Sequence, residues 1–173
     1  MPGIFLIFCI FMLYVTNLYD LFSLPVVTNP AQAATEYHNG TSYVNARLSN
    51  LYYTGVNRTG GRKIKGFYYY CLYDNNCYYM LISPSALGLD GNSQTPPATL
   101  SEFNCKAKLD SNIAEIDMLN NMVSNNLDWT SQSLNMMSSK VLINQYRMSQ
   151  GREYILLALI AFVSLLAILH ELI

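Results

Sequence analysis

Long apolar runs lie at the two ends of the chain, and the region between them mixes polar, aromatic and short apolar stretches. From Ile4 to Val15 no residue is charged, but this run is shorter than the about 20 residues of a membrane-spanning helix. Its length is typical of the hydrophobic region of a signal peptide. The nearest cleavage-like sequence, Ala31 to Ala33, lies well beyond the run, and no Lys or Arg precedes the run. We therefore predict an uncleaved signal-anchor over residues 1–24, with a cleaved signal peptide as the alternative.

The second apolar run lies at the other end, from Tyr154 to Leu169, and it also lacks charged residues. Extended to Ile173, it has the length that a helix needs to cross about 30 Å of hydrocarbon. Its only ionisable side chains are His170 and Glu171, at the end, where they can reach the headgroup region. A buried core helix is the alternative, but no other segment is apolar enough to surround it. We predict a transmembrane helix over residues 153–173.

Two spans at opposite ends of a chain would place everything between them on one side of the membrane. Lys140, Arg147 and Arg152 precede the second span, and the positive-inside rule then favours the cytosolic or nucleoplasmic side. Asn39 and Asn57 begin glycosylation sequons, which favour the opposite side. The topology of the middle region stays open at this point.

Short β-prone stretches separated by turn residues occupy residues 42–83 of a β-rich region 42–99, after a linker over residues 25–41, and Pro and Gly residues break regular structure over residues 83–97. The stretches 42–48 and 50–56 and a Tyr-rich hairpin over 66–83 predict an antiparallel meander of three or four strands. The loop 57–65 between them carries four basic residues: Arg58, Arg62, Lys63 and Lys65. Such a cluster is usually a solvated turn, with contact to an anionic lipid or a partner as the alternative.

The hairpin contains Cys71 and Cys77 on either side of a turn near Asp74. A three-residue loop over 73–75 would set the two cysteines opposite each other, at the separation that a disulfide requires. Two buried thiols are the alternative, and a metal site is disfavoured because no second close Cys or His pair follows. Cys105 would then be free, paired with one hairpin cysteine, or bonded to another chain.

Apolar residues recur at alternating spacings of three and four from Ile113 onward, which predicts helix within the region 100–152. Polar residues, among them Asn120 and Asn144, interrupt this seam, so it fits either two helices folded back on each other or a partner-binding helix. We expect its end to continue as a helical stalk into the C-terminal span. The candidate interface residues are Ile113, Ile116, Val123 and Leu127.

The composition excludes several classes of protein and favours a membrane protein. The chain is 51% hydrophobic, only 12% charged and has a net charge of −1, so neither a basic nucleic-acid binder nor an acidic tail is expected. Its two histidines lie in a linker and in the last apolar run, far from any candidate nucleophile. No phosphate-binding or metalloprotease motif is present. We predict no catalytic, cofactor-binding or metal-binding residue and no small-molecule substrate.

These features give an α+β membrane protein with a signal-like N-terminal span, a small Cys-bearing and Asn/Tyr-rich middle region and a C-terminal span. In length and layout the chain resembles the small per os infectivity factors of baculoviruses, in particular the fourth group. Those are envelope proteins of the occlusion-derived virion, sorted through the inner nuclear membrane of the host cell, and they assemble into a complex needed for entry into insect midgut cells. The basic residues beside the second span fit such sorting.

The resemblance implies a non-enzymatic subunit of a viral entry complex, held in a virion envelope by the lipid bilayer and by other subunits of the same kind. The alternative is a supernumerary structural subunit of a cellular or organellar membrane complex. A third possibility is a secreted protein that is cleaved near Ala33 and tethered only by its C-terminal segment. The state of the cysteines and of the sequons would separate these classes.

Overall fold

The computed structural model describes residues 24–89, 95–127 and 129–146, together with Phe162. The two predicted spans therefore lie almost wholly outside the described residues. Within the described part of the chain, no helix is both long enough and apolar enough to cross a membrane.

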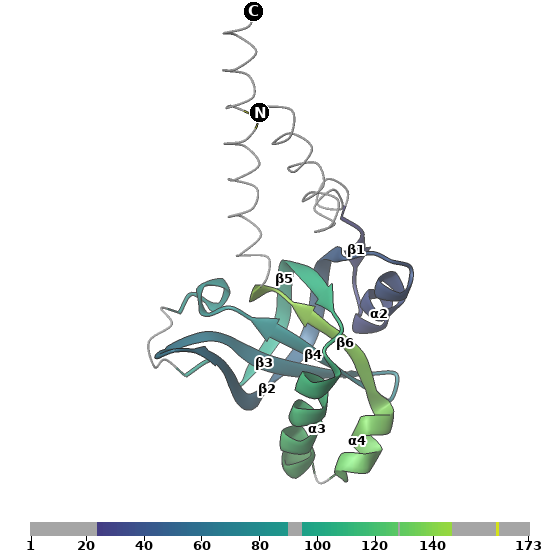
Figure 1. Cartoon of the computed structure of the whole chain (residues 1–173), viewed down its shortest axis with the longest axis vertical. Coiled ribbons are helices and arrows are strands. Elements are labelled where there is room, and N and C mark those ends of the chain that lie inside the picture. Colours follow the sequence, from purple (N-terminus) through teal and green to yellow (C-terminus); the bar gives the residue numbers. More distant parts are fainter. Residues whose placement is uncertain (1–23, 90–94, 128, 147–161, 163–173) are drawn as a thin grey trace, which may run out of the picture.

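Six strands and three α-helices form an α+β fold with a mixed sheet (Figure 1). The strands are β1 (Val26–Val27), β2 (Tyr43–Gly60), β3 (Lys63–Tyr73), β4 (Asn76–Ile82), β5 (Thr99–Asp110) and β6 (Ser138–Asn144). The helices are α2 (Pro30–His38), α3 (Ile113–Leu127) and α4 (Ser131–Met137), and a short 3-10 turn, η2 (Pro84–Leu87), follows β4. The predicted α+β class is confirmed for this part of the chain.

Five of the strands close into a barrel, because β2 pairs with a different neighbour along each half. Its first half, from Tyr43 to Tyr52, pairs with β5, and its second half, from Tyr52 to Gly60, pairs with β3. The circle continues through β4 and β6 back to β5, with the β4–β6 pair parallel. This strand order is that of the OB-type barrel, a five-stranded Greek-key fold. The short β1 adds a parallel pairing to β2.

The long β2 strand can serve both halves of the barrel because two residues in it have left-handed backbone conformations. Asn50 has φ 54° and Gly55 has φ 82°, and after Asn50 the inward-facing positions change from even to odd numbers. A bulge around Gly55 shifts the register against β3, and the Thr54 hydroxyl donates a 2.8 Å hydrogen bond to the Tyr68 carbonyl there. The sequence predicted two short strands here, and the structure has one bent strand.

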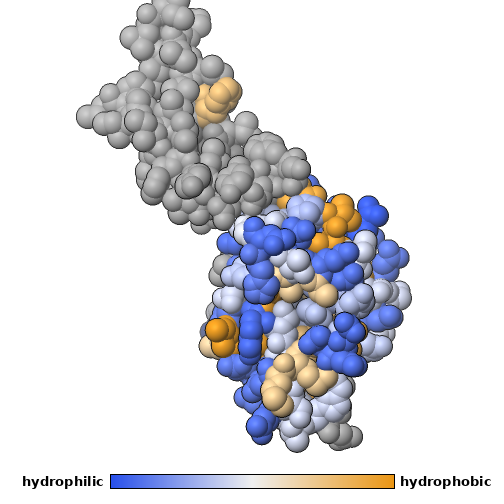
Figure 2. Space-filling model, turned by 90° about the vertical axis from the view of Figure 1, so that its right-hand side faces the viewer, coloured by the Kyte–Doolittle hydropathy of each residue, from blue (hydrophilic) through white to orange (hydrophobic). Residues whose placement is uncertain are grey.

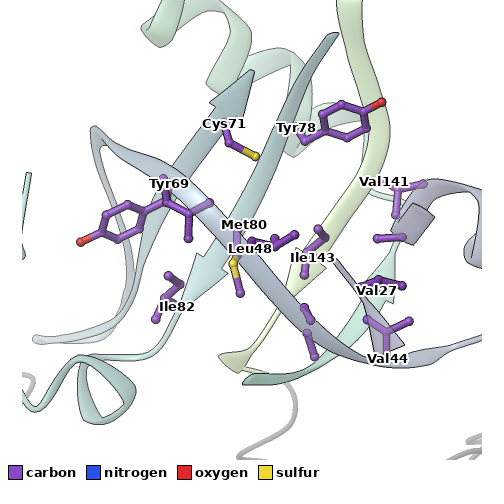
Figure 3. Packing of buried hydrophobic residues seen from close by; sticks show 14 of the residues in the cluster. Val27, Val44, Leu48, Tyr69, Cys71, Tyr78, Met80, Ile82, Val141 and Ile143 are labelled. Carbon is purple, nitrogen blue, oxygen red and sulfur yellow. The ribbon is translucent and has the colours of Figure 1, made fainter. Parts of the chain in front are cut away.

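The interior of the barrel is filled by alternate side chains of all five strands (Figure 3). Leu48, Tyr69, Met80 and Ile143 are fully or almost fully buried there. The helix α2 contributes Ala33, which is also fully buried. Cleavage near Ala33 would remove β1 and part of α2, so the described fold uses residues on both sides of that sequence.

Two predicted segments are corrected by the structure. The linker over residues 25–41 contains β1 and α2, and Asn29 caps that helix by accepting a hydrogen bond from the Gln32 backbone amide. Within the predicted helical region 100–152, α3 and α4 are helices, but residues 99–110 and 138–144 are strands. The 4-3 spacing was misleading at Val141, which lies in a β-branched apolar run buried on both faces, a pattern typical of an internal strand.

Candidate interaction surfaces

The two hairpin cysteines point to opposite faces of the sheet, and the predicted disulfide is wrong in this structure. The turn has two residues, Asp74 and Asn75, both with positive φ, rather than the predicted three. This one-residue difference in register pairs Cys71 with Tyr78 and Leu72 with Cys77. Because side chains alternate along a strand, the shift sends Cys71 into the barrel and Cys77 to its outer face.

All three cysteines of the described residues are free thiols. Burial raises the pKa of Cys71 and of Cys105 to about 12, and that of Cys77 to about 11. These thiols therefore stay protonated near neutral pH and are poor nucleophiles. The alternative reading of the hairpin, two buried thiols, describes the structure.

A second hydrophobic cluster lies on the outer face of β3 and β4, beneath α3 and α4. The helices contribute Ile116, Leu119, Val123 and Leu134, which are fully buried against side chains of the sheet. Those sheet residues are Tyr68, Tyr70, Cys77, Tyr79, Leu81 and Leu142. β3 and β4 are the second and third strands of the barrel. In OB-type barrels the outer face of these two strands binds oligonucleotides or oligosaccharides, whereas here α3 and α4 cover it.

A buried polar network fixes the two helices to the barrel. Asn120 of α3 is fully buried, and its side-chain oxygen accepts a 2.7 Å hydrogen bond from the Tyr79 hydroxyl. Its amide nitrogen donates to Asn135 of α4 at 2.5 Å and to the Ser138 hydroxyl at 2.8 Å. Burial raises the pKa of Tyr79, so its hydroxyl remains a donor. Asn120, which interrupts the apolar spacing of the predicted helix, thus fixes the position of α3 on the protein's own barrel.

The N-terminus of α3 is held by a second polar group of side chains. The Glu115 carboxylate accepts hydrogen bonds from the Tyr68 hydroxyl and from the side-chain amide of Asn112, the latter at 2.7 Å. Arg58 of β2 lies 3.4 Å from the same carboxylate. Burial is the main cause that raises the pKa of Tyr68, with Glu115 adding to the effect. This contact joins α3 to the β2–β3 hairpin.

The outward faces of α3 and α4 carry large apolar side chains in contact with solvent. Met118 and Met122 lie one helical turn apart on α3, and Met136 of α4 is 75% exposed. Ile113, at the start of α3, is 56% exposed. Seen from the α4 side, the surface has separate apolar areas among hydrophilic ones (Figure 2). Unbranched, flexible methionine side chains are common at protein-binding surfaces because they adapt to a partner.

The four interface candidates from the sequence thus divide into different groups. Ile116 and Val123 lie on the buried side of α3 and belong to the core, whereas Ile113 is exposed. The side chain of Leu127 lies outside the described residues. Met118, Met122 and Met136 were not predicted, because the alternating spacing of apolar residues identifies the buried side of a helix and does not consider apolar residues on its other sides.

The predicted glycosylation sites are both accessible. Asn39 lies just after α2 and Asn57 lies in β2, and both are exposed. The side-chain oxygen of Asn57 also accepts a hydrogen bond from the Tyr53 hydroxyl. Exposure is a requirement for modification, so both sequons remain candidates.

Of the three basic residues expected beside the C-terminal span, Lys140 lies within the described residues. Lys140 lies in β6 and contacts Asp117 of α3 at 3.7 Å, on the helical side of the barrel. The predicted helical stalk is therefore wrong at its start, where β6 is a strand. Arg147 and Arg152 lie outside the described residues.

No site with the composition of a metal centre is found in residues 24–89, 95–127 and 129–146. There, no three His, Cys, Asp or Glu side chains gather closely enough to hold an ion. Comparison of the chain with protein-family models, with curated proteins and with solved structures finds no match. The likeness to an OB-type barrel is therefore one of strand order alone.

Proposed function

We propose that this protein is a non-enzymatic, membrane-anchored subunit of an assembly, specifically of a viral envelope entry complex required for oral infection of midgut cells. The observation that carries the proposal is the apolar outer surface of α3 and α4, formed by Ile113, Met118, Met122 and Met136. These side chains are exposed although the same helices bury their opposite face well. Exposed, flexible methionine side chains are common at protein–protein contact sites.

The surrounding geometry also supports an assembly role. The face that an OB-type barrel uses to bind a ligand is covered by α3 and α4. The buried thiols of the chain are unreactive at neutral pH. The apolar terminal segments supply the membrane anchor, and the resemblance in length and layout to small per os infectivity factors supplies the specific complex. The partner surface would be that of another subunit in the same membrane.

The alternative function, a structural subunit of a cellular or organellar complex, is favoured by one observation. The three described cysteines are free and Cys71 and Cys77 point apart, as is typical of proteins in a reducing compartment. Analysis of glycans on the mature protein separates the two, because a glycan at Asn39 or Asn57 requires passage through a glycosylating lumen.

The proposal is tested by charge substitution on the exposed helical surface. The full-length variant Met118→Glu/Met122→Glu should lose partner subunits in native gels, because two carboxylates would be buried against an apolar partner surface. Ala98→Glu/Ser101→Glu introduces the same charge at exposed positions away from the helices and should leave the assembly intact. Oral infectivity of virus carrying each variant should follow the assembly. Full assembly with both methionines replaced would refute the proposed surface.

Substitution of Ile116 or Val123 by Asp would not test an interface. Both residues are fully buried in the chain itself, so these substitutions would unfold the helical layer whether or not a partner binds. The exposed methionines are the informative positions.

A further inference from the structure

The outward side of α3 carries a second row of regularly spaced residues, opposite the buried one. Five exposed residues form this row, called here the outer stripe: Ala114, Met118, Asn121, Met122 and Asn125. Positions 114, 118, 121 and 125 follow spacings of four, three and four, so their side chains lie on one side of the helix. α3 therefore has one face against the barrel and a second, equally regular face in contact with solvent.

The outer stripe contains no charged residue, although the exposed side of a surface helix usually carries several. The two carboxylates of α3 lie close to cations of the same chain, Glu115 at 3.4 Å from Arg58 and Asp117 at 3.7 Å from Lys140. α4 has no charged residue. A charged partner would find no countercharge on the stripe, so an uncharged partner fits it best.

The composition of the outer stripe is also complementary to itself. In a two-fold symmetric contact the same residues meet from both sides, so residues of one charge sign would repel their own copies. An Asn side chain has both donor and acceptor groups, so it can pair with another Asn. Methionine side chains are flexible and pack against each other without a fixed geometry. Among uncharged partners, this composition favours a second copy of the chain.

The order of residues along the stripe fits two antiparallel copies of α3. Antiparallel packing about the middle of the stripe places Met118 of one copy opposite Met122 of the other, and Ala114 opposite Asn125. Two large side chains then meet on each side of the two-fold axis, and a small side chain meets an amide at each end. Parallel packing would instead place the two small alanines opposite each other and leave a gap.

From this pattern we infer that the outer stripe binds the outer stripe of a second copy of the chain, with the two α3 helices antiparallel. The inference rests on the proposed function, because it names the occupant of the same helical surface. An uncharged helix of a different subunit is the competing occupant. Such a partner would not require a stripe whose residue order is complementary to itself.

The test measures self-association of the full-length protein alone in detergent, by analytical ultracentrifugation. Met118→Glu and Met122→Lys, each made separately, should raise the dissociation constant of the dimer at least about tenfold, because each places a charge against a methionine. In a mixture of the two variants the dimer should return, since the new carboxylate of one chain would face the new ammonium group of the other.

Two controls accompany this measurement. Ala98→Glu/Ser101→Glu, at exposed positions away from the helices, should leave the dimer intact. The dissociation constant of the unsubstituted dimer should change less than about twofold between low and high salt, because no ion pair crosses the contact. A dimer that dissociates in high salt would contradict an uncharged contact.

Native gels of the assembly separate this inference from the proposed function. A chain that is monomeric on its own, while Met118→Glu/Met122→Glu loses partner subunits, would overturn the self-contact and leave the partner surface standing with another occupant. If that variant keeps both the dimer and the assembly, both proposals fall. A dimer that does not return in the mixture of single variants would overturn the antiparallel contact.

Discussion

The barrel interior and the layer beneath α3 and α4 are both well buried, yet they are built differently. The interior is filled almost entirely by apolar side chains of strands that pair in a closed circle. The outer layer is covered by two short helices and contains the polar side chains of Asn120, Ser124 and Ser138. Every buried side-chain polar atom in the described residues has a hydrogen-bond partner.

The difference indicates a division of roles. Closed strand pairing gives the barrel no free edge among its five strands, so it should open only on global unfolding. The helices are held by one apolar face and by specific hydrogen bonds, so they can open locally at lower cost. A partner that covers the exposed methionines would stabilise this weaker layer, so assembly should reduce the local opening of the helices.

The largest expected effect compares equivalent truncations in the two regions. Leu48→Ala in the barrel and Leu119→Ala beneath α3 each remove a fully buried leucine and should each cost about 3 kcal/mol. Leu48→Ala should accelerate hydrogen exchange throughout the described part of the chain, whereas Leu119→Ala should accelerate it mainly in α3 and α4. Equal acceleration in both variants would mean that the two layers unfold as one unit.

Removal of the central polar side chain should have the next largest effect. Asn120→Ala leaves the Tyr79 hydroxyl, Asn135 and Ser138 without a buried partner and should cost about 2 kcal/mol in denaturant unfolding. Tyr79→Phe removes one of these contacts and should cost less. If Asn120→Ala is neutral, the network does not hold the helices in place.

High pH should weaken the fold through the buried thiols on both sides of the sheet. The pKa values of Cys71 and Cys77 are raised in the folded state, so their contribution is complete below the unfolded value near 9 and is lost as pH rises toward 11 to 12. At pH 10 each thiol should already cost about 1 kcal/mol relative to pH 8. Cys71→Ala/Cys77→Ala should flatten the dependence of the unfolding free energy on pH, and an unchanged slope would contradict the assignment.

The smallest effect concerns the contact at the start of α3. Arg58→Gln removes the ion pair with the largely buried Glu115 and should cost about 0.5 kcal/mol, while Lys140→Gln removes a pair exposed on both sides and should cost nothing measurable. Thermal unfolding of both variants makes the comparison. A larger loss for Lys140→Gln would reverse the assignment of which pair holds the helix.

Local sequence signals predicted the Tyr-rich hairpin and the start of a helix after Ser111, because turn residues and apolar spacing act over a few positions. They could not predict that β2 bends at Asn50 and Gly55, or that β5 and β6 close the barrel, because those pairings join residues far apart in the chain. The predicted turn was one residue longer than the observed turn at Asp74 and Asn75. A shift of one residue in strand register moves each side chain to the other face, and this shift alone decided whether Cys71 could contact Cys77.

The candidate surfaces were predicted less well than the strands. A pattern of apolar spacing finds the side of a helix that is buried, and it cannot distinguish burial against the same chain from burial against a partner. Ile116 and Val123 were therefore assigned to an interface although the barrel already covers them. Exposure of Met118 and Met122 becomes visible only once the packing of α3 is known.

Hydrogen exchange of the full chain, compared between the native membrane assembly and the purified protein, tests the central claim most directly. We expect slower exchange in α3 and α4 within the assembly and little change in the barrel strands β3 and β4 beneath them. Unchanged exchange in α3 and α4 in an intact assembly, with protection elsewhere in the described chain, would contradict a partner surface on these helices.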